Sequence, residues 1–157
     1  AFMAPIAPHI AAQQQGQRMQ VDRLAGFTSG VLMQGANLTL VEGAGGWRVP
    51  VNERETLADL AIALSMPVVL VVGMRLGCIN HALLTVEAIT RDGLKLAGWV
   101  ANCVDPAMVQ LEANVVTLQN RIQAPMLGLI PHFADIDQAS GRVEACQTYL
   151  DLETLLN

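Results

Sequence analysis

Apolar residues recur along the chain with two spacings, and the order of these spacings predicts the fold. Stretches with the three-to-four-residue spacing of an amphipathic helix alternate with short runs rich in β-branched residues. The predicted elements are a helix over 21–34, a strand over 38–41, a helix over 57–64, a strand over 68–72, a helix over 80–91, a strand over 96–101, a helix over 106–121, a strand over 126–130 and a helix over 145–156. This alternation predicts one α/β domain over 1–157, with a parallel sheet and helices on both faces.

Local signals mark several boundaries. Thr56 suits the N-cap of the helix over 57–64, and Pro67 stops that helix. The run Val-Val-Leu-Val-Val over 68–72 is uninterrupted, as in a strand buried on both faces. Pro106 suits the first turn of the helix over 106–121.

One apolar stretch, 57–74, approaches the length of a membrane span and carries a single charge. Asp59, Ser65 and Pro67 interrupt it, and its two halves have different spacings. We therefore expect a helix followed by a strand, and no association with a membrane.

Composition narrows the class of protein. Of the 157 residues, 52% are apolar, which is enough for a sizeable core. The net charge of -5 argues against a nucleic-acid-binding protein, which normally has a basic face. The cysteines are odd in number and lack metal-binding spacing (Cys78, Cys103, Cys146), which favours a reduced cytoplasmic protein.

The only lysine is Lys95, and it does not lie in a phosphate-binding loop. It is flanked by leucines in Gly-Leu-Lys-Leu-Ala-Gly, whereas a P-loop needs lysine followed by serine or threonine. Any phosphate chemistry of this chain therefore uses no P-loop lysine of its own.

Ligands of parallel sheets bind beyond the carboxyl ends of the strands, so candidate ligand-binding residues are expected at those positions. Glu42 follows the run 38–41 and precedes Gly43, Ala44 and Gly45. A carboxylate at a strand tip can bind Mg²⁺ with phosphate completing the shell, while glycines let the backbone approach a ligand. The alternative is a solvated glutamate before a glycine turn.

The segment 77–80 joins the strand over 68–72 to the next helix. Its residues, Gly-Cys-Ile-Asn, include no acid, so the positive end of the helix dipole faces no local anion and can bind a carboxylate or phosphate. Asn80 could instead be an ordinary N-cap, with His81 a solvated residue of the first turn.

Two further strand ends carry polar or aromatic residues. Asn102 ends the strand over 96–101, and its amide could pair with an adenine edge or form a turn. Cys103, beside it, suits a small buried filler. Pro131, His132 and Phe133 end the last strand, where His132 could touch a ligand.

Together these segments resemble the dethiobiotin synthetase family. The resemblance rests on Val-Glu-Gly-Ala-Gly-Gly at 41–46, Gly-Cys-Ile-Asn-His at 77–81, Ala-Gly-Trp-Val-Ala-Asn at 97–102 and Leu-Gly-Leu-Ile-Pro at 127–131. It implies a P-loop NTPase-like fold whose N-terminal strand, phosphate loop and helix are missing here. The chain is then expected to be the C-terminal part of a longer homodimeric enzyme, inactive by itself.

The resemblance also implies a reaction and roles for residues. The family is an ATP- and Mg²⁺-dependent ligase of biotin biosynthesis, which closes a ureido ring from 7,8-diaminononanoate and CO₂ and releases ADP and phosphate. By resemblance, Glu42 would bind Mg²⁺. The ATP site would comprise Glu42, Gly43, Ala44, Gly45, Asn102, Cys103, Pro131, His132 and Phe133, and the substrate carboxylate would meet Gly77, Cys78, Ile79 and Asn80.

Two other functions fit parts of the pattern. A P-loop amidoligase of the cobyrinic acid diamide synthase type uses a similar glycine loop but also needs a glutamine-hydrolysing domain. A non-catalytic α/β dimerisation module would explain the lack of a P-loop lysine without any phosphate chemistry.

Overall fold

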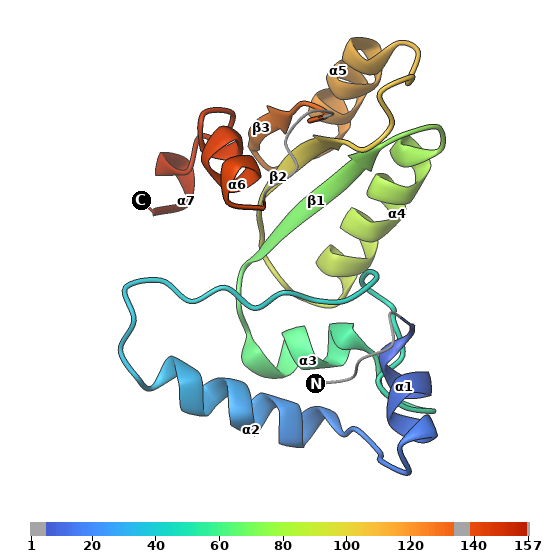
Figure 1. Ribbon diagram of the computed structural model, residues 1–157, viewed down its shortest axis with the longest axis vertical. Coiled ribbons are helices and arrows are strands. Elements are labelled where there is room, and N and C mark those ends of the chain that lie inside the picture. Colours follow the sequence, from blue (N-terminus) through green and yellow to red (C-terminus); the bar gives the residue numbers. More distant parts are fainter. Residues whose placement is uncertain (1–5, 134–138, 157) are drawn as a thin grey trace. The chain divides into compact units, whose positions relative to one another are not determined.

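The computed structural model describes residues 6–133 and 139–156 (Figure 1). Its elements are α1 (Pro8–Gln14), α2 (Val21–Leu32), α3 (Leu57–Leu64), β1 (Val68–Met74), α4 (Cys78–Arg91), β2 (Leu96–Cys103), α5 (Leu111–Arg121), β3 (Met126–Ile130), α6 (Ala139–Gln147) and α7 (Glu153–Leu156). The chain divides into two compact units, which we call the helical unit (1–66 with 92–94) and the sheet unit (67–91 with 95–157). The single-domain organisation stays a prediction.

The sheet unit confirms the parallel α/β architecture. Its strands lie in the order β1-β2-β3, and both pairs are parallel. Each crossover contains one helix, α4 after β1 and α5 after β2 (Figure 1). The apolar pattern predicted all three strands and both crossover helices, and β1 and β2 each extend two residues beyond the predicted end.

One apolar core joins the sheet to α4 and α5. Alternate residues of a strand point to the same face, so Val72 and Met74 of β1 lie with Trp99 and Ala101 of β2. The helices contribute Cys78, Ala82, Val115 and Leu118. Trp99 is fully buried, and its Nε1 has no hydrogen-bond partner among the described residues. Trp99 therefore stabilises the core through the packing of its ring and not through a hydrogen bond to a described residue.

β1 is not buried on both faces as its uninterrupted apolar run predicts. Val69 and Val71 point away from the core and are 39% and 59% exposed. The reason is that the core helices α4 and α5 pack against the side of the sheet that carries Val72 and Met74. Alternation along the strand then leaves the intervening valines uncovered.

The strand predicted over 38–41 is wrong, because these residues are irregular. Leu38 and Leu40 are 62% and 83% exposed. Among the described residues, the backbone from 36 to 45 exchanges no hydrogen bond with another backbone group. A strand is stabilised by hydrogen bonds to a neighbouring strand. The run 38–41 pairs with no other strand among the described residues, so its apolar composition alone does not make it a strand.

Four of the predicted helices have other bounds in the structure. α2 ends at Leu32 rather than at 34. α5 begins at Leu111 rather than at Pro106, because the Asp105 carboxylate accepts a hydrogen bond from the Ala107 N–H at 2.9 Å and holds a turn there. α4 begins two residues earlier than expected, at Cys78. The predicted helix over 145–156 is instead two helices, α6 and α7, separated by a turn at 148–149 and a short segment without helix.

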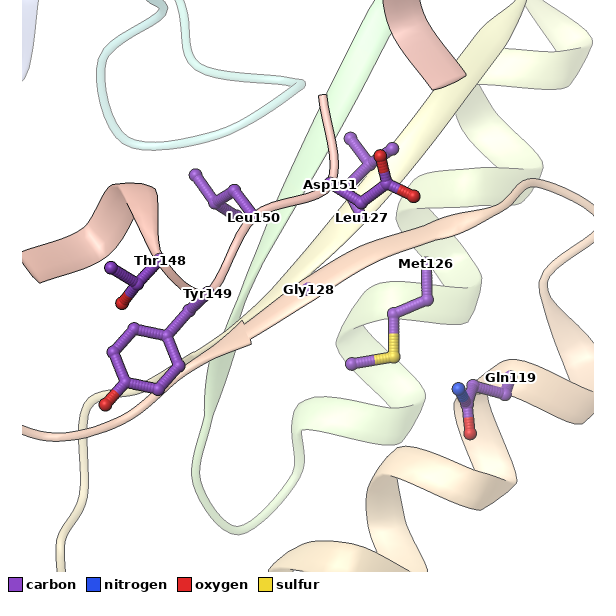
Figure 2. A pocket seen from close by; sticks show the side chains of 8 residues that line it. All are labelled: Gln119, Met126, Leu127, Gly128, Thr148, Tyr149, Leu150 and Asp151. Atoms are coloured by element: carbon purple, nitrogen blue, oxygen red, sulfur yellow. The ribbon is translucent and has the colours of Figure 1, made fainter. Parts of the chain in front are cut away.

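The segment between α6 and α7 pairs with β3. Leu150 pairs with Gly128 in an antiparallel bridge, and the Asp151 N–H donates to the Leu127 carbonyl oxygen at 2.7 Å. Figure 2 shows the residues 148–151 running beside Gly128, around a hollow of about 420 Å³. A Cβ on Gly128 would lie 1.9 Å from the Tyr149 carbonyl oxygen, so only glycine permits this approach.

We therefore expect Gly128→Ala to lower the free energy of unfolding by about 1–3 kcal/mol, because the clash is with backbone that cannot rotate away. The measurement is urea denaturation of the purified protein. The control is Gly26→Ala in α2, where a Cβ meets nothing within 4 Å. The control should raise stability by about 0.5–1 kcal/mol. Equal midpoints for Gly128→Ala and the unmodified protein would contradict the expectation.

Candidate functional site at the sheet edge and the glycine segment

The parallel register brings three of the predicted segments to one edge of the sheet. Asn102 pairs with Gly73 of β1 on one side and with Ile130 of β3 on the other. Pro131 follows Ile130 directly, and Gly77 follows the end of β1 by three residues. Candidate residues from 77–80, 102–103 and 131–133 therefore gather at the carboxyl edge, where ligands of parallel sheets bind.

Asn102 lies inside β2, so its interpretation as a turn residue is wrong. The residue is half-buried, and its side-chain amide makes no hydrogen bond to any residue that the structure describes. An amide offers a donor and an acceptor together, as an adenine edge requires. Cys103 is half-buried beside it, with Sγ 3.5 Å from the Asp105 carbonyl oxygen.

The start of α4 presents backbone rather than side chains. Gly77 has a φ of +90°, which favours glycine, and its carbonyl oxygen accepts the His81 N–H at 3.2 Å. Cys78 is buried in the core, and Ile79 packs against that core. Asn80 is the third residue of the helix, so its interpretation as an N-cap is wrong.

The first turn of α4 contains no acidic residue, as predicted. The helix has 14 residues, so partial positive charge gathers at its N-terminus, where the Cys78 N–H donates to the Arg75 carbonyl oxygen at 3.0 Å and the N–H groups of Ile79 and Asn80 follow it. With Cys78 and Ile79 turned to the core, a carboxylate at this end would meet backbone N–H groups and the Asn80 side chain.

Aromatic residues flank the end of β3. His132 is exposed, whereas Phe133 is half-buried and its ring lies 6.1 Å from the ring of Tyr149, tilted by 58°. Tyr149 was not predicted as part of the site. No local pattern marks it, because the contact with Phe133 depends on the pairing of Leu150 with Gly128.

The glycine segment (Glu42–Gly46) belongs to the helical unit. Glu42 is exposed in irregular backbone, so the expected position at the tip of a buried strand is wrong. Gly45 has a φ of +83°, which explains the need for glycine there. A hollow of about 340 Å³ lies beside Glu42, bordered by Phe27 and Val31 of α2.

The described residues fit a metal site in which phosphate and water supply most of the ligands. Within the described ranges there is no cluster of three or more histidine, cysteine or acidic side chains that could enclose a metal ion. Mg²⁺ is commonly held by one or two carboxylates, with substrate phosphates and water supplying the other ligands. The exposed Glu42 carboxylate fits that arrangement.

Helix α3 begins close to the glycine segment. The Asp59 carboxylate Oδ2 accepts hydrogen bonds from the Thr56 N–H at 2.6 Å and from the Thr56 hydroxyl at 2.7 Å. The hydroxyl bond, followed by the backbone bond, lowers the pKa of Asp59 below its ordinary value. The predicted helix over 57–64 with its cap at Thr56 is confirmed, and Asp59 completes the cap.

Comparison with known proteins adds independent evidence. Residues 1–140 match the family model described as AAA domain. The chain is 59% identical over its whole length to an ATP-dependent dethiobiotin synthetase of Cellvibrio japonicus, and covers 66% of that protein. It is 46% identical to the enzyme of the same name from Chromohalobacter salexigens, with 97% of this chain and 67% of the relative covered.

The chain belongs to the dethiobiotin synthetase family. The resemblance drawn from the motifs at 41–46, 77–81 and 97–102 is thereby confirmed. In an enzyme of the same name from Pseudomonas aeruginosa the identity is 55% over 155 residues. The chain spans about two thirds of the length of the curated relatives that it matches. None of the helices formed by the described residues is long and apolar enough to cross a membrane.

We expect Asp59→Asn to lower the free energy of unfolding at pH 7 by about 1 kcal/mol, because the cap of α3 is weakened. The pKa of Asp59 is lower in the folded protein, so its stabilisation is fully present above the ordinary value of 3.8. This stabilisation is lost as the pH falls through the lower folded-state pKa. The difference between variant and unmodified protein, measured by urea denaturation, should therefore shrink below pH 3.8.

The control for this measurement is Thr56→Ser, which retains the hydroxyl that donates to Asp59. It should keep most of the stability and the same pH dependence. A loss for Asp59→Asn that stays constant from pH 7 down to pH 2 would contradict the assigned role.

Proposed function

We propose that this chain is the larger part of an ATP-dependent dethiobiotin synthetase. The observation that carries the proposal is the identity of 54–59% to curated enzymes of that name, over 99–100% of this chain. The arrangement at the carboxyl edge of the sheet supports it, because the candidate nucleotide and carboxylate sites lie at neighbouring strand ends.

The proposed reaction closes a five-membered urea. One amine of 7,8-diaminononanoate adds to CO₂ and forms a carbamate. The γ-phosphoryl group of ATP passes to the carbamate oxygen, and the second amine then attacks the carbon and displaces phosphate. The products are dethiobiotin, ADP and phosphate, and no oxidant or reductant is needed.

In this proposal the nucleotide base lies at the ends of β2 and β3. The Asn102 amide donates to and accepts from the adenine edge, with Cys103 beside it. Pro131, His132 and Phe133 line the base site. Phe133 is held by its ring contact with Tyr149, which adds Tyr149 to the residues that support this site.

Glu42 would be the protein's ligand to Mg²⁺, and Gly43, Ala44 and Gly45 would lie beside the phosphates and the carbamate. When bound, the ion offsets negative charge on the phosphoryl group being transferred. Two observations support these roles, the exposure of the Glu42 carboxylate and the absence of side chains on the glycines. Backbone can approach an anion closely at such positions.

The start of α4 would bind the far carboxylate of the substrate. Gly77 to Asn80 offer backbone N–H groups at a helix N-terminus that has no acid of its own. We propose that each active site of a homodimer takes this segment from the partner subunit. The cytoplasm is the proposed compartment.

The first test is turnover of the full-length gene product. With ATP, Mg²⁺, bicarbonate and 7,8-diaminononanoate, mass spectrometry should detect dethiobiotin. Glu42→Gln should lower kcat by about 100-fold or more, because the neutral amide binds the cation weakly. Glu144→Gln, at an exposed position of α6, should leave kcat unchanged. Full activity of Glu42→Gln would contradict the proposed metal ligand.

The adenine site has its own test. Asn102→Ala should raise the KM for ATP by about tenfold, which corresponds to about 1.4 kcal/mol, and change kcat little, because the base does not react. The control is Asn120→Ala, at an exposed position of α5. An unchanged KM for ATP in Asn102→Ala would contradict the placement of the base.

A further inference from the structure

A closed loop over 49–57 (the stem loop) follows the glycine segment directly. Its two ends are joined, since the Leu57 N–H donates to the Val49 carbonyl oxygen at 2.8 Å and Pro50 pairs with Thr56. Inside the loop, the Val51 N–H donates to the Glu55 carbonyl oxygen at 2.8 Å. Val51 is 1% exposed, so the loop is anchored in apolar packing as well as by hydrogen bonds.

Asn52 organises the interior of the stem loop. It is 7% exposed, and its Oδ1 accepts the N–H groups of Arg54 and Glu55, each at 3.0 Å. Its Nδ2 donates to the Met19 carbonyl oxygen at 2.9 Å and to the Glu55 carboxylate. The side chain thus uses its full capacity of two donated and two accepted hydrogen bonds.

Glu55 extends this network to α2. Its Oε2 accepts the Val21 N–H, at the first residue of that helix, at 3.2 Å. Gln20, in the N-cap position, makes no side-chain cap. Asn52 and Glu55 therefore tie the stem loop to the residues 19–21, and replace the missing cap of α2.

The two ends of the stem loop lie beside the glycine segment, and the Val49 N–H donates to the Gly46 carbonyl oxygen at 3.4 Å. A Cβ on Gly45 would lie 3.0 Å from Val49 Cγ2, and a Cβ on Gly43 would lie 3.8 Å from Leu57 Cδ1. Val49 and Leu57 are the residues that the closing hydrogen bond joins. The residues that keep Val49 and Leu57 joined therefore also fix the side chains that lie against Gly43 and Gly45.

We infer that Asn52 and Glu55 are positioning residues for the glycine segment. They hold Val49 and Leu57 at a fixed separation, and through them the backbone of Gly43 and Gly45. The inference deepens the proposed function, on which it rests, since this backbone is where the ATP phosphates and the carbamate would lie. Displacement of a reacting group by a small distance costs far more in kcat than in binding.

The test compares Asn52→Ala and Glu55→Ala with two conservative variants in the full-length enzyme. Glu55→Gln keeps an oxygen acceptor for Val21 and Asn52, and Asn52→Ser keeps a short acceptor for the N–H groups of the turn. The alanine variants should lose about tenfold or more in kcat, with the KM for the diamine within about twofold. The conservative variants should recover most of kcat. The control is Glu53→Ala, in the same loop but 78% exposed, which should behave like the unmodified enzyme.

A second measurement does not depend on activity. Hydrogen exchange of backbone amides in peptides covering 49–57, where the N–H groups of Val51 and Leu57 are hydrogen-bonded, should be about tenfold faster or more in the alanine variants and unchanged in Glu53→Ala. Loss of thermal stability with unchanged exchange and unchanged kcat would overturn the inference. If the unmodified enzyme forms no dethiobiotin, the proposed function fails, whereas unchanged exchange in an active enzyme overturns only the positioning role. If Asn52→Ala does not fold, the comparison of kcat and amide exchange between Glu55→Ala and Glu55→Gln tests the inference instead.

Discussion

The pairing of β2 with a strand on each side is the interaction on which the sheet unit depends. β2 satisfies its backbone hydrogen bonds with β1 and β3, and its alternate residues reach both faces. Trp99 and Ala101 point into the core between β1, α4 and α5, and both are fully buried. On the other face, a Cβ on Gly98 would lie 2.7 Å from Leu127, so this strand permits its neighbour to pack closely.

The same ladder places the candidate chemistry. Parallel strands end at one edge, and the register sets Asn102 between Gly73 and Ile130. The side chains that follow the strand ends do not pack in the core, so they can contact a ligand. The start of α4 differs from the strand ends. Its first side chain, Cys78, belongs to the core, so the backbone there is what can bind a ligand. Core and site are thus built from adjacent residues with opposite orientations.

The acidic residues of the helical unit differ in their hydrogen-bond partners. Some stabilise the fold, whereas Glu42 has no such role within the described part of the chain. Asp59 caps α3 through Thr56, and Glu55 accepts hydrogen bonds from Asn52 and Val21. Glu42 is exposed and makes no hydrogen bond or ion pair with another described residue. A carboxylate already engaged in structure would lose those bonds on binding a cation, whereas the Glu42 carboxylate would lose none.

Local signals determined much of this protein from the sequence alone. The types of α3, β1, α4, β2 and β3 follow from the spacing of apolar residues and from caps and prolines, which act within a few residues. The motifs at 41–46, 77–81 and 97–102 also determined the family. The rest was decided by partners distant in the chain. The run 38–41 has strand composition but finds no strand to pair with, and the predicted helix over 145–156 is interrupted because Gly128 admits Leu150 beside β3. The support of Phe133 by Tyr149, and of Gly43 and Gly45 by the stem loop, likewise exists only through contacts between segments. Spacing along a chain cannot reveal such contacts, because they depend on which backbone groups remain to be paired after folding.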